Sequence, residues 1–193
     1  MRRVASEPLT AVGKSIDVEV RPDPTSCSLT ATQLATLAEA CERSQAMLSS
    51  HARMEEEQLG GLSGIVYRHS STLLTQAAER TGRRSRRLAE GLAAYAQGIT
   101  EVQRLMDDAV AGASPYLMVG GGRIWSPAEP AGPDDTRLTP AWTAWRDAVD
   151  RWRAARALEE ETSQAWLRVV DRGVVIDEVE PPLLDLPLDG TVR

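Results

Sequence analysis

Hydrophobic residues recur every three or four positions over three long stretches of the chain, which is the spacing of one face of an α-helix. The first stretch predicts a helix over residues 31–58, with its apolar row at Leu34, Leu37, Cys41, Ser44, Leu48 and His51. The second row is unbroken over six heptads and predicts a long helix in coiled-coil-like packing. Its members are Tyr67, Ser71, Leu74, Ala78, Thr81, Ser85, Leu88, Leu92, Tyr95, Ile99, Val102, Met106 and Ala109.

A third helical pattern begins at Thr139-Pro140, a good N-cap followed by proline at the first helical position. It continues to residue 172, with its apolar row at Trp142, Trp145, Val149, Trp152, Ala155, Leu158, Thr162, Trp166 and Val169. Four of the five tryptophans lie on this face. We interpret the row as core packing against the other helices. A surface for another protein is the alternative, because tryptophan is frequent in both settings.

Short β segments are predicted at two places outside the helices. Ile16, Val18 and Val20 alternate with polar residues over residues 15–20, and residues 116–125 contain two short apolar runs around a glycine turn. Residues 174–179 are a further candidate strand. The predicted fold is mainly α, a long antiparallel helical hairpin plus a third helix that completes a three-helix bundle. The chain divides into an N-terminal extension (1–30), the hairpin (31–113), a Gly/Pro-rich connector (114–138), the tryptophan-rich helix (139–172) and a C-terminal tail (173–193).

The two helices of the hairpin differ in length, so the shorter one cannot cover the longer one. If the chain reverses near Gly60 and Gly61, residues whose numbers sum to about 121 lie opposite each other in an antiparallel pair. The row around residues 92–109 then needs a further partner. We predict a partner-binding surface made of Leu92, Tyr95, Ile99, Val102 and Met106, together with Trp142 and Trp145.

Composition narrows the function classes. The net charge of −6 argues against a general nucleic-acid binder, whose phosphate contacts require a basic excess. No run of 18 or more apolar residues occurs, and no apolar core follows Met1-Arg2-Arg3, so we expect neither a membrane span nor a conventional signal peptide. Cys27 and Cys41 allow at most one internal disulfide, and Cys41 lies in an apolar helical row, where a buried free thiol is common.

Three features invite a chemical interpretation, and we weigh each against a structural one. His51 and His69 would approach each other near the hairpin turn, with Glu55 one helical turn from His51, but a fourth ligand is missing and we predict no metal site. Residues 80–88 contain five arginines; with Glu39 and Glu42 across the hairpin, salt-bridged or solvated helix faces are favoured over a nucleic-acid or lipid patch.

The third feature is the glycine run of residues 119–123, which reads VGGGR. Its spacing matches neither the Walker nor the dinucleotide pattern, so it predicts a hairpin turn and not a phosphate loop. No Ser/His/Asp or Cys/His arrangement with supporting context is found. We therefore predict a protein that is not an enzyme and needs no cofactor.

The order of the segments resembles a known family. The segments are ATQLATLAEACERSQAML (31–48), GLSGIVYR (61–68), LAEGLAAYAQGITEVQRLMDDAVAGA (88–113) and YLMVGGGRIWSP (116–127). Helix, short turn with a Leu-x-Gly tripeptide, long helix and glycine-rich connector is the order in the WXG-type and LXG-type hairpin proteins of type VII secretion. The match looks closest to the N-terminal signal domains of actinobacterial effectors of these systems. Gly61, Leu62 and Gly64 stand where the family has its turn motif.

The resemblance implies a secreted or cell-surface protein that acts by binding a helical partner, either a small WXG-type protein or the helical domain of a toxin. The family's export signal, a tyrosine followed four residues later by an acidic residue, is absent: Ile99 follows Tyr95 and Gly120 follows Tyr116. That absence favours the alternative, a cytoplasmic structural or regulatory protein that homodimerises through the same helix row. A metal-dependent helical enzyme is the third hypothesis.

Overall fold

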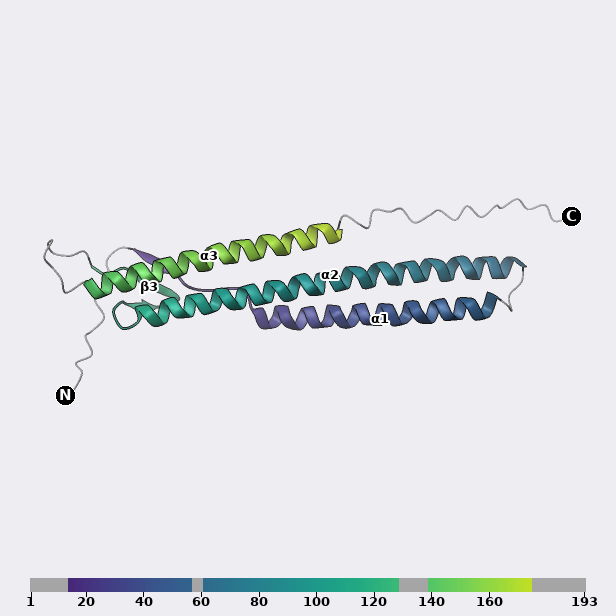
Figure 1. Ribbon diagram of the computed structural model, residues 1–193, viewed down its shortest axis with the longest axis horizontal. Coiled ribbons are helices and arrows are strands. Elements are labelled where there is room, and N and C mark those ends of the chain that lie inside the picture. The colour runs from purple at the N-terminus through teal and green to yellow at the C-terminus, as the bar shows by residue number, and fades with distance from the viewer. Residues whose placement is uncertain (1–13, 57–60, 129–138, 175–193) are drawn as a thin grey trace, which may run out of the picture.

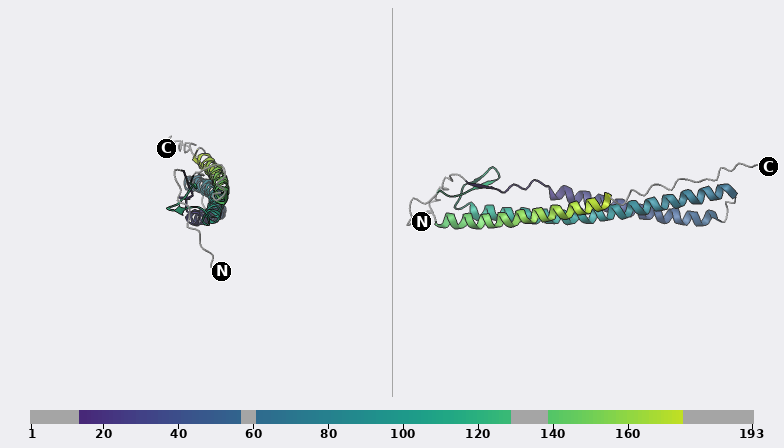
Figure 2. Two further views of the ribbon diagram at one scale, coloured as in Figure 1. Left: turned by 90° about the vertical axis from the view of Figure 1, so that its left-hand side faces the viewer. Right: turned by 90° about the horizontal axis from the view of Figure 1, so that it is seen from above.

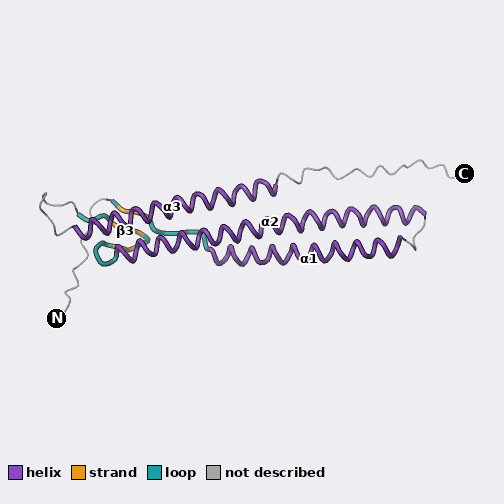
Figure 3. The backbone as a smooth tube through the Cα atoms, in the orientation of Figure 1, coloured by secondary structure: helices purple, strands orange, loops and turns teal. Residues whose placement is uncertain are grey.

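The computed structural model describes residues 14–56, 61–128 and 139–174. Three helices dominate, and a small sheet lies beside one end of the assembly (Figures 1 and 3). The elements, in chain order, are β1 (Ser15–Asp17), α1 (Pro24–Glu56), α2 (Gly61–Ala113), β2 (Val119–Gly120), β3 (Arg123–Trp125) and α3 (Thr139–Val174). The predicted mainly α, three-helix arrangement with short β segments is confirmed.

Helix α2 is the axis of the molecule, and the other two helices pack on different halves of it (Figure 1). α1 runs antiparallel to the N-terminal half, where a Cβ built at Gly82 would lie 3.1 Å from the Cβ of Cys41. α3 runs antiparallel to the C-terminal half, with Val169 beside Gly91 and Thr162 beside Gly98. α1 and α3 scarcely touch each other, so the three helices form a staggered, open assembly (Figure 2).

Helix α1 starts at Pro24, seven residues before the predicted start at residue 31. The reason is an N-cap at Asp23, whose carboxylate accepts hydrogen bonds from the backbone N–H groups of Thr25 (3.0 Å) and Ser26 (3.2 Å) and from the Ser26 hydroxyl. The hydroxyl and Thr25 contribute most to lowering the pKa of Asp23 below its usual value. Proline at the first helical position adds a preset backbone angle.

The predicted turn motif at Gly61, Leu62 and Gly64 is not in the turn. α1 ends at Glu56, earlier than the predicted residue 58, and α2 begins at Gly61, so all three residues belong to the first turn of α2. Glycine costs little there, because the first amides of a helix have no intrahelical partner to lose. Residues 57–60, which include Gly60 of the predicted chain reversal, lie outside the described residues.

The sheet is antiparallel with strand order β1-β3-β2. β2 and β3 form the predicted hairpin, and its two turn residues, Gly121 (φ 57°) and Gly122 (φ 72°), adopt the positive φ angles that a tight two-residue turn requires. β1 pairs Ile16 with Ile124 but ends at Asp17, short of the predicted residue 20. Val174 belongs to α3, and the rest of the candidate strand 174–179 lies outside the described residues.

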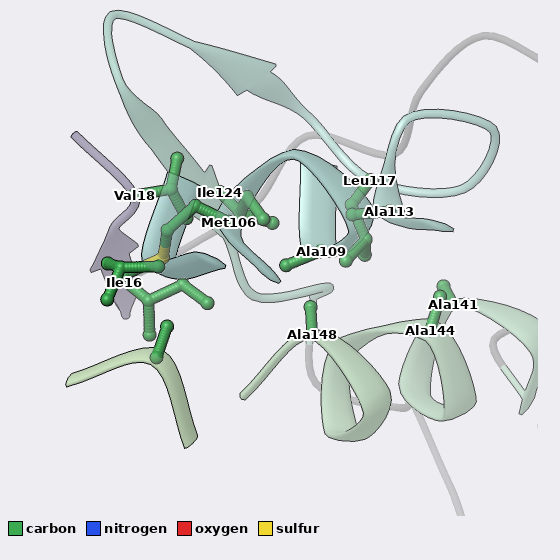
Figure 4. Packing of buried hydrophobic residues seen from close by; sticks show 12 residues of the cluster. Ile16, Val18, Met106, Ala109, Ala113, Leu117, Ile124, Ala141, Ala144 and Ala148 are labelled. Carbon is green, nitrogen blue, oxygen red and sulfur yellow. The ribbon is translucent and has the colours of Figure 1, made fainter. Parts of the chain in front are cut away.

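The main core lies where the sheet, the C-terminal half of α2 and the N-terminal half of α3 meet (Figure 4). Apolar side chains from α2 and the sheet supply most of its volume, whereas α3 contributes mainly alanine. Small side chains let the axes of two helices approach closely. The buried members are Ile16, Val18, Val102, Met106, Ala109, Ala113, Leu117, Ile124, Ala141, Ala144, Ala148 and Ala155.

Candidate interaction surface

The predicted partner-binding surface is buried within the chain. Ile99 and Val102 are 0% exposed, Met106 and Leu92 are buried, and Tyr95 is half-buried with its ring centroid 6.3 Å from that of Trp166. The placement was wrong because other segments of the same chain already cover this part of α2. α3 and the N-terminal segment before α1 pack around Val102 and Met106, and the start of α1 lies opposite Leu92.

The N-terminal segment is held between α2 and α3 by apolar and polar contacts. Ile16 and Val18 belong to the core, and the indole N–H of Trp152 donates to the backbone oxygen of Asp17 at 2.8 Å. The guanidinium of Arg156 donates to the backbone oxygens of Asp17 (2.9 Å) and Glu19 (3.1 Å). An extended segment thus fills the position that a further helix would take in a closed bundle.

The tryptophans of α3 flank the helix contact and do not form its centre. Trp142, Trp145 and Trp152 are half-buried, and the most buried positions of this half of α3 are the alanines Ala141, Ala144, Ala148 and Ala155. The interpretation of the tryptophan row as core packing holds for Trp145 and Trp152, which pack against the buried cluster. Trp142 and Trp145 therefore do not form a free docking surface.

Among the described residues, α1 is the only helix that packs on the N-terminal half of α2. Val169 lies beside Gly91 and α3 ends at Val174, five residues or about 7.5 Å further on. α3 therefore stops close to position 86 of α2, and about 37 Å of helix remains beyond it. We call this two-helix region, formed by residues 36–56 of α1 and 61–86 of α2, the distal hairpin (Figure 1).

One side of the distal hairpin carries ion pairs. Arg86 of α2 pairs with Glu42 of α1 across the helix contact, and Arg83 pairs with Glu79 along α2 at 2.9 Å. The prediction that these arginines lie on salt-bridged faces is confirmed for Arg83 and Arg86. Glu42 is one of the two predicted partners, whereas Glu79 is not. The charged side chains of this side are exposed and solvated.

The other side is apolar and exposed. Ala38 is buried at the helix contact, and on α1 Leu37 projects from the flank opposite to that of Glu42. Leu37 and Leu74 are 46% and 57% exposed, respectively. Exposed and half-buried neighbours from the predicted helix rows extend this patch. We call it the open face, with the members Leu37, Cys41, Ser44, Leu48, Tyr67, Leu74, Ala78, Thr81 and Leu88.

The open face contains no acidic or basic side chain, in contrast to the side with the ion pairs. Its members come from the outer edges of the two apolar rows, which a third helix would cover in a closed bundle. Exposed apolar patches of this kind mark sites of protein association more often than they mark plain surface. The open face is therefore the best candidate for a functional site in the described part of the chain.

The other chemical candidates gain no support. Among the described residues, no cluster of three or more metal-ligating side chains exists, and His51 and His69 are both exposed. Cys27 and Cys41 are free thiols on one helix, about 21 Å apart along its axis, which excludes a disulfide between them in this fold. None of the described helices has an apolar stretch long enough for a transmembrane segment.

Comparison with protein-family models, curated proteins and solved structures finds no match for this chain. The open face therefore has to be interpreted from its own chemistry. Sequence reasoning located its residues within the apolar rows but assigned the exposed part to the wrong half of α2. The available signal was the alternation of Ile16, Val18 and Val20, which showed an apolar segment in need of a partner.

Proposed function

We propose that this chain is a non-enzymatic protein that binds a helical partner through the open face of the distal hairpin. The observation that carries the proposal is the contrast between the two sides of that hairpin. One carries ion pairs, and the other exposes Leu37 and Leu74 beside half-buried apolar neighbours. An amphipathic helix laid along this face would complete the packing that α3 provides for the other half of α2.

The system we propose is type VII secretion, with the chain acting as a substrate, an effector signal domain or the partner of an effector. Support comes from the order of hairpin, connector and glycine-rich segment described above, and the hairpin itself is the element that such proteins use to pair. The partner would be a small WXG-type protein or the helical domain of a toxin. The protein would then be exported or associated with the cell surface.

The alternative is a cytoplasmic protein that homodimerises through the same open face. Two copies of an antiparallel hairpin can pair apolar face to apolar face and form a four-helix assembly. The Tyr-x-x-x-acidic export signal is absent, since the fourth residue after Tyr95 is Ile99 and the fourth after Tyr116 is Gly120, and this absence favours the alternative.

The test is to express the tagged chain in its source organism and to recover it separately from cells and from medium. The proteins that co-purify are identified by mass spectrometry, and the mass of the complex is measured by sedimentation equilibrium. We expect one small helical protein in stoichiometric amount, with part of the complex in the medium. A homodimer found only in cells would instead support the alternative.

Substitutions decide whether the open face is the site. Leu37→Glu with Leu74→Glu should abolish the complex and leave the helical content unchanged, because both side chains are already exposed. Leu167→Glu is the matched control, since this leucine is 56% exposed on α3, away from the distal hairpin. Equal binding by all variants would place the partner elsewhere and overturn the proposal.

A further inference from the structure

The row of α2 that packs against α3 changes character at the point where α3 ends. Gly98 and Gly91 lie in this row, and each is in close contact with an α3 side chain. Steps of four, three and four residues back from Gly91 along the same row lead to Arg87, Arg84 and Arg80, all exposed. Glycine thus gives way to arginine where the covering helix stops.

Arg80 and Arg87 are not explained by the packing of the distal hairpin. Arg83 and Arg86 instead form ion pairs with glutamates on the charged side of the distal hairpin. Among the described residues, Arg80 and Arg87 have no ion-pair partner, and Arg80 donates only to the backbone oxygen of Gln76. The negative C-terminus of α3 can attract the nearest arginines, but Arg80 lies about 9 Å beyond the position of α3's last residue.

The segment that follows α3 has the complementary chemistry. Residues 175–193 contain five acidic residues and one arginine, and three of the acids come first, at Asp177, Glu178 and Glu180. Prolines and leucines follow over residues 181–188. The α2 row has the same order when read away from α3: the three arginines come first and are followed by the apolar Leu73 and Val66.

We propose that residues 175–193 bind this row of α2 as an intramolecular ligand, with the acidic part on the arginines and the Pro/Leu part on Leu73 and Val66. The distance suffices: the row from position 86 to Val66 spans about 30 Å, whereas 14 residues in a polyproline-like conformation span about 43 Å. The proposal is independent of the partner bound at the open face, although Leu73 and Leu74 place the two surfaces side by side.

The test is limited proteolysis of the full chain with a glutamate-specific protease, following cleavage after Glu178 by mass spectrometry at low ionic strength. Arg80→Glu with Arg87→Glu is the test variant. Arg43→Glu with Arg153→Glu is the control, because it makes the same change in net charge at exposed positions outside the row. Circular dichroism confirms that both variants keep the helical content.

We expect cleavage after Glu178 to be about tenfold faster in the test variant than in the unchanged chain and the control, because docking limits access to the bond. Added salt should remove most of the difference, since exposed ion pairs are screened. Equal rates in all three proteins would overturn the proposal.

A distance measurement gives a second readout that does not depend on the protease. Spin labels at His69→Cys and Thr191→Cys, with Cys27 and Cys41 replaced by serine, should give a narrow distance distribution in the chain with the native arginines. The distribution should broaden with Arg80→Glu and Arg87→Glu. A broad distribution in both chains would again contradict docking.

Discussion

The two halves of α2 are parts of one continuous helix, yet they lie in different surroundings. The C-terminal half is covered by α3 and by the extended segment around Ile16 and Val18, and its row reads Ile99, Val102, Met106 with almost no exposure. The N-terminal half has α1 alone, and the corresponding position Leu74 is 57% exposed. A heptad row predicts that a helix has a partner, but the number of partners is decided by what the rest of the chain can reach.

The comparison is tested most strongly by placing a charge in each half. Ile99→Asp puts a carboxylate into a fully enclosed site and should lower the free energy of unfolding by more than about 4 kcal/mol. Leu74→Asp, at the same kind of row position, should change it by no more than about 0.5 kcal/mol, because the side chain remains in water. Urea unfolding followed by circular dichroism measures both, and similar losses would mean that the open face is covered in solution.

The closeness of the α2–α3 contact is tested next, at its glycines. A Cβ at Gly98 would lie 2.5 Å from the Thr162 Cγ2, and one at Gly91 would lie 2.7 Å from the Val169 Cγ1. Each change to alanine should therefore cost about 1–3 kcal/mol through overpacking, despite the better helix propensity of alanine. Gly112→Ala is the control, since only the flexible end of Arg151 lies nearby, at 3.3 Å, and we expect a neutral or slightly stabilising effect in thermal unfolding.

The contribution of the N-terminal segment, which covers the C-terminal half of α2, is tested by a smaller change. Trp152→Phe keeps a ring of similar character and removes the indole N–H that donates to Asp17 at 2.8 Å. We expect a loss of about 1 kcal/mol, since Arg156 still donates to the same oxygen. Amide hydrogen exchange should accelerate at β1, where Ile16 pairs with Ile124, and remain unchanged in α1. If amide exchange accelerates equally along the whole chain, the N-terminal segment does not open separately from the helices.

The sequence predicts the helices well because their signal is local and repetitive. The start of α1 was also present in the sequence, since Asp23-Pro24 is the same kind of signal as Thr139-Pro140, but the apolar row that predicted this helix begins only at Leu34. The exposed face could not be predicted, because it depends on where α3 stops along α2. That register is set by contacts such as Val169 with Gly91, which join residues far apart in the chain.

The smallest expected effect concerns the N-cap of α1 at Asp23, where the extended segment ends and the helix begins. Hydrogen bonds from Ser26 and Thr25 lower the pKa of Asp23 in the folded state. Ionised Asp23 therefore stabilises the folded state relative to the unfolded state. This stabilisation is complete above the unfolded pKa and is lost as the pH falls through the lower folded pKa. Asp23→Ala should therefore lower the melting temperature slightly at pH 7 and by less at pH 2, where the protonated carboxyl still accepts a hydrogen bond but the contribution of the charge is lost. Asp23→Asn should keep the cap but lose the pH dependence, and equal effects of Asp23→Ala at both pH values would show that the charge of the carboxylate contributes nothing to the cap.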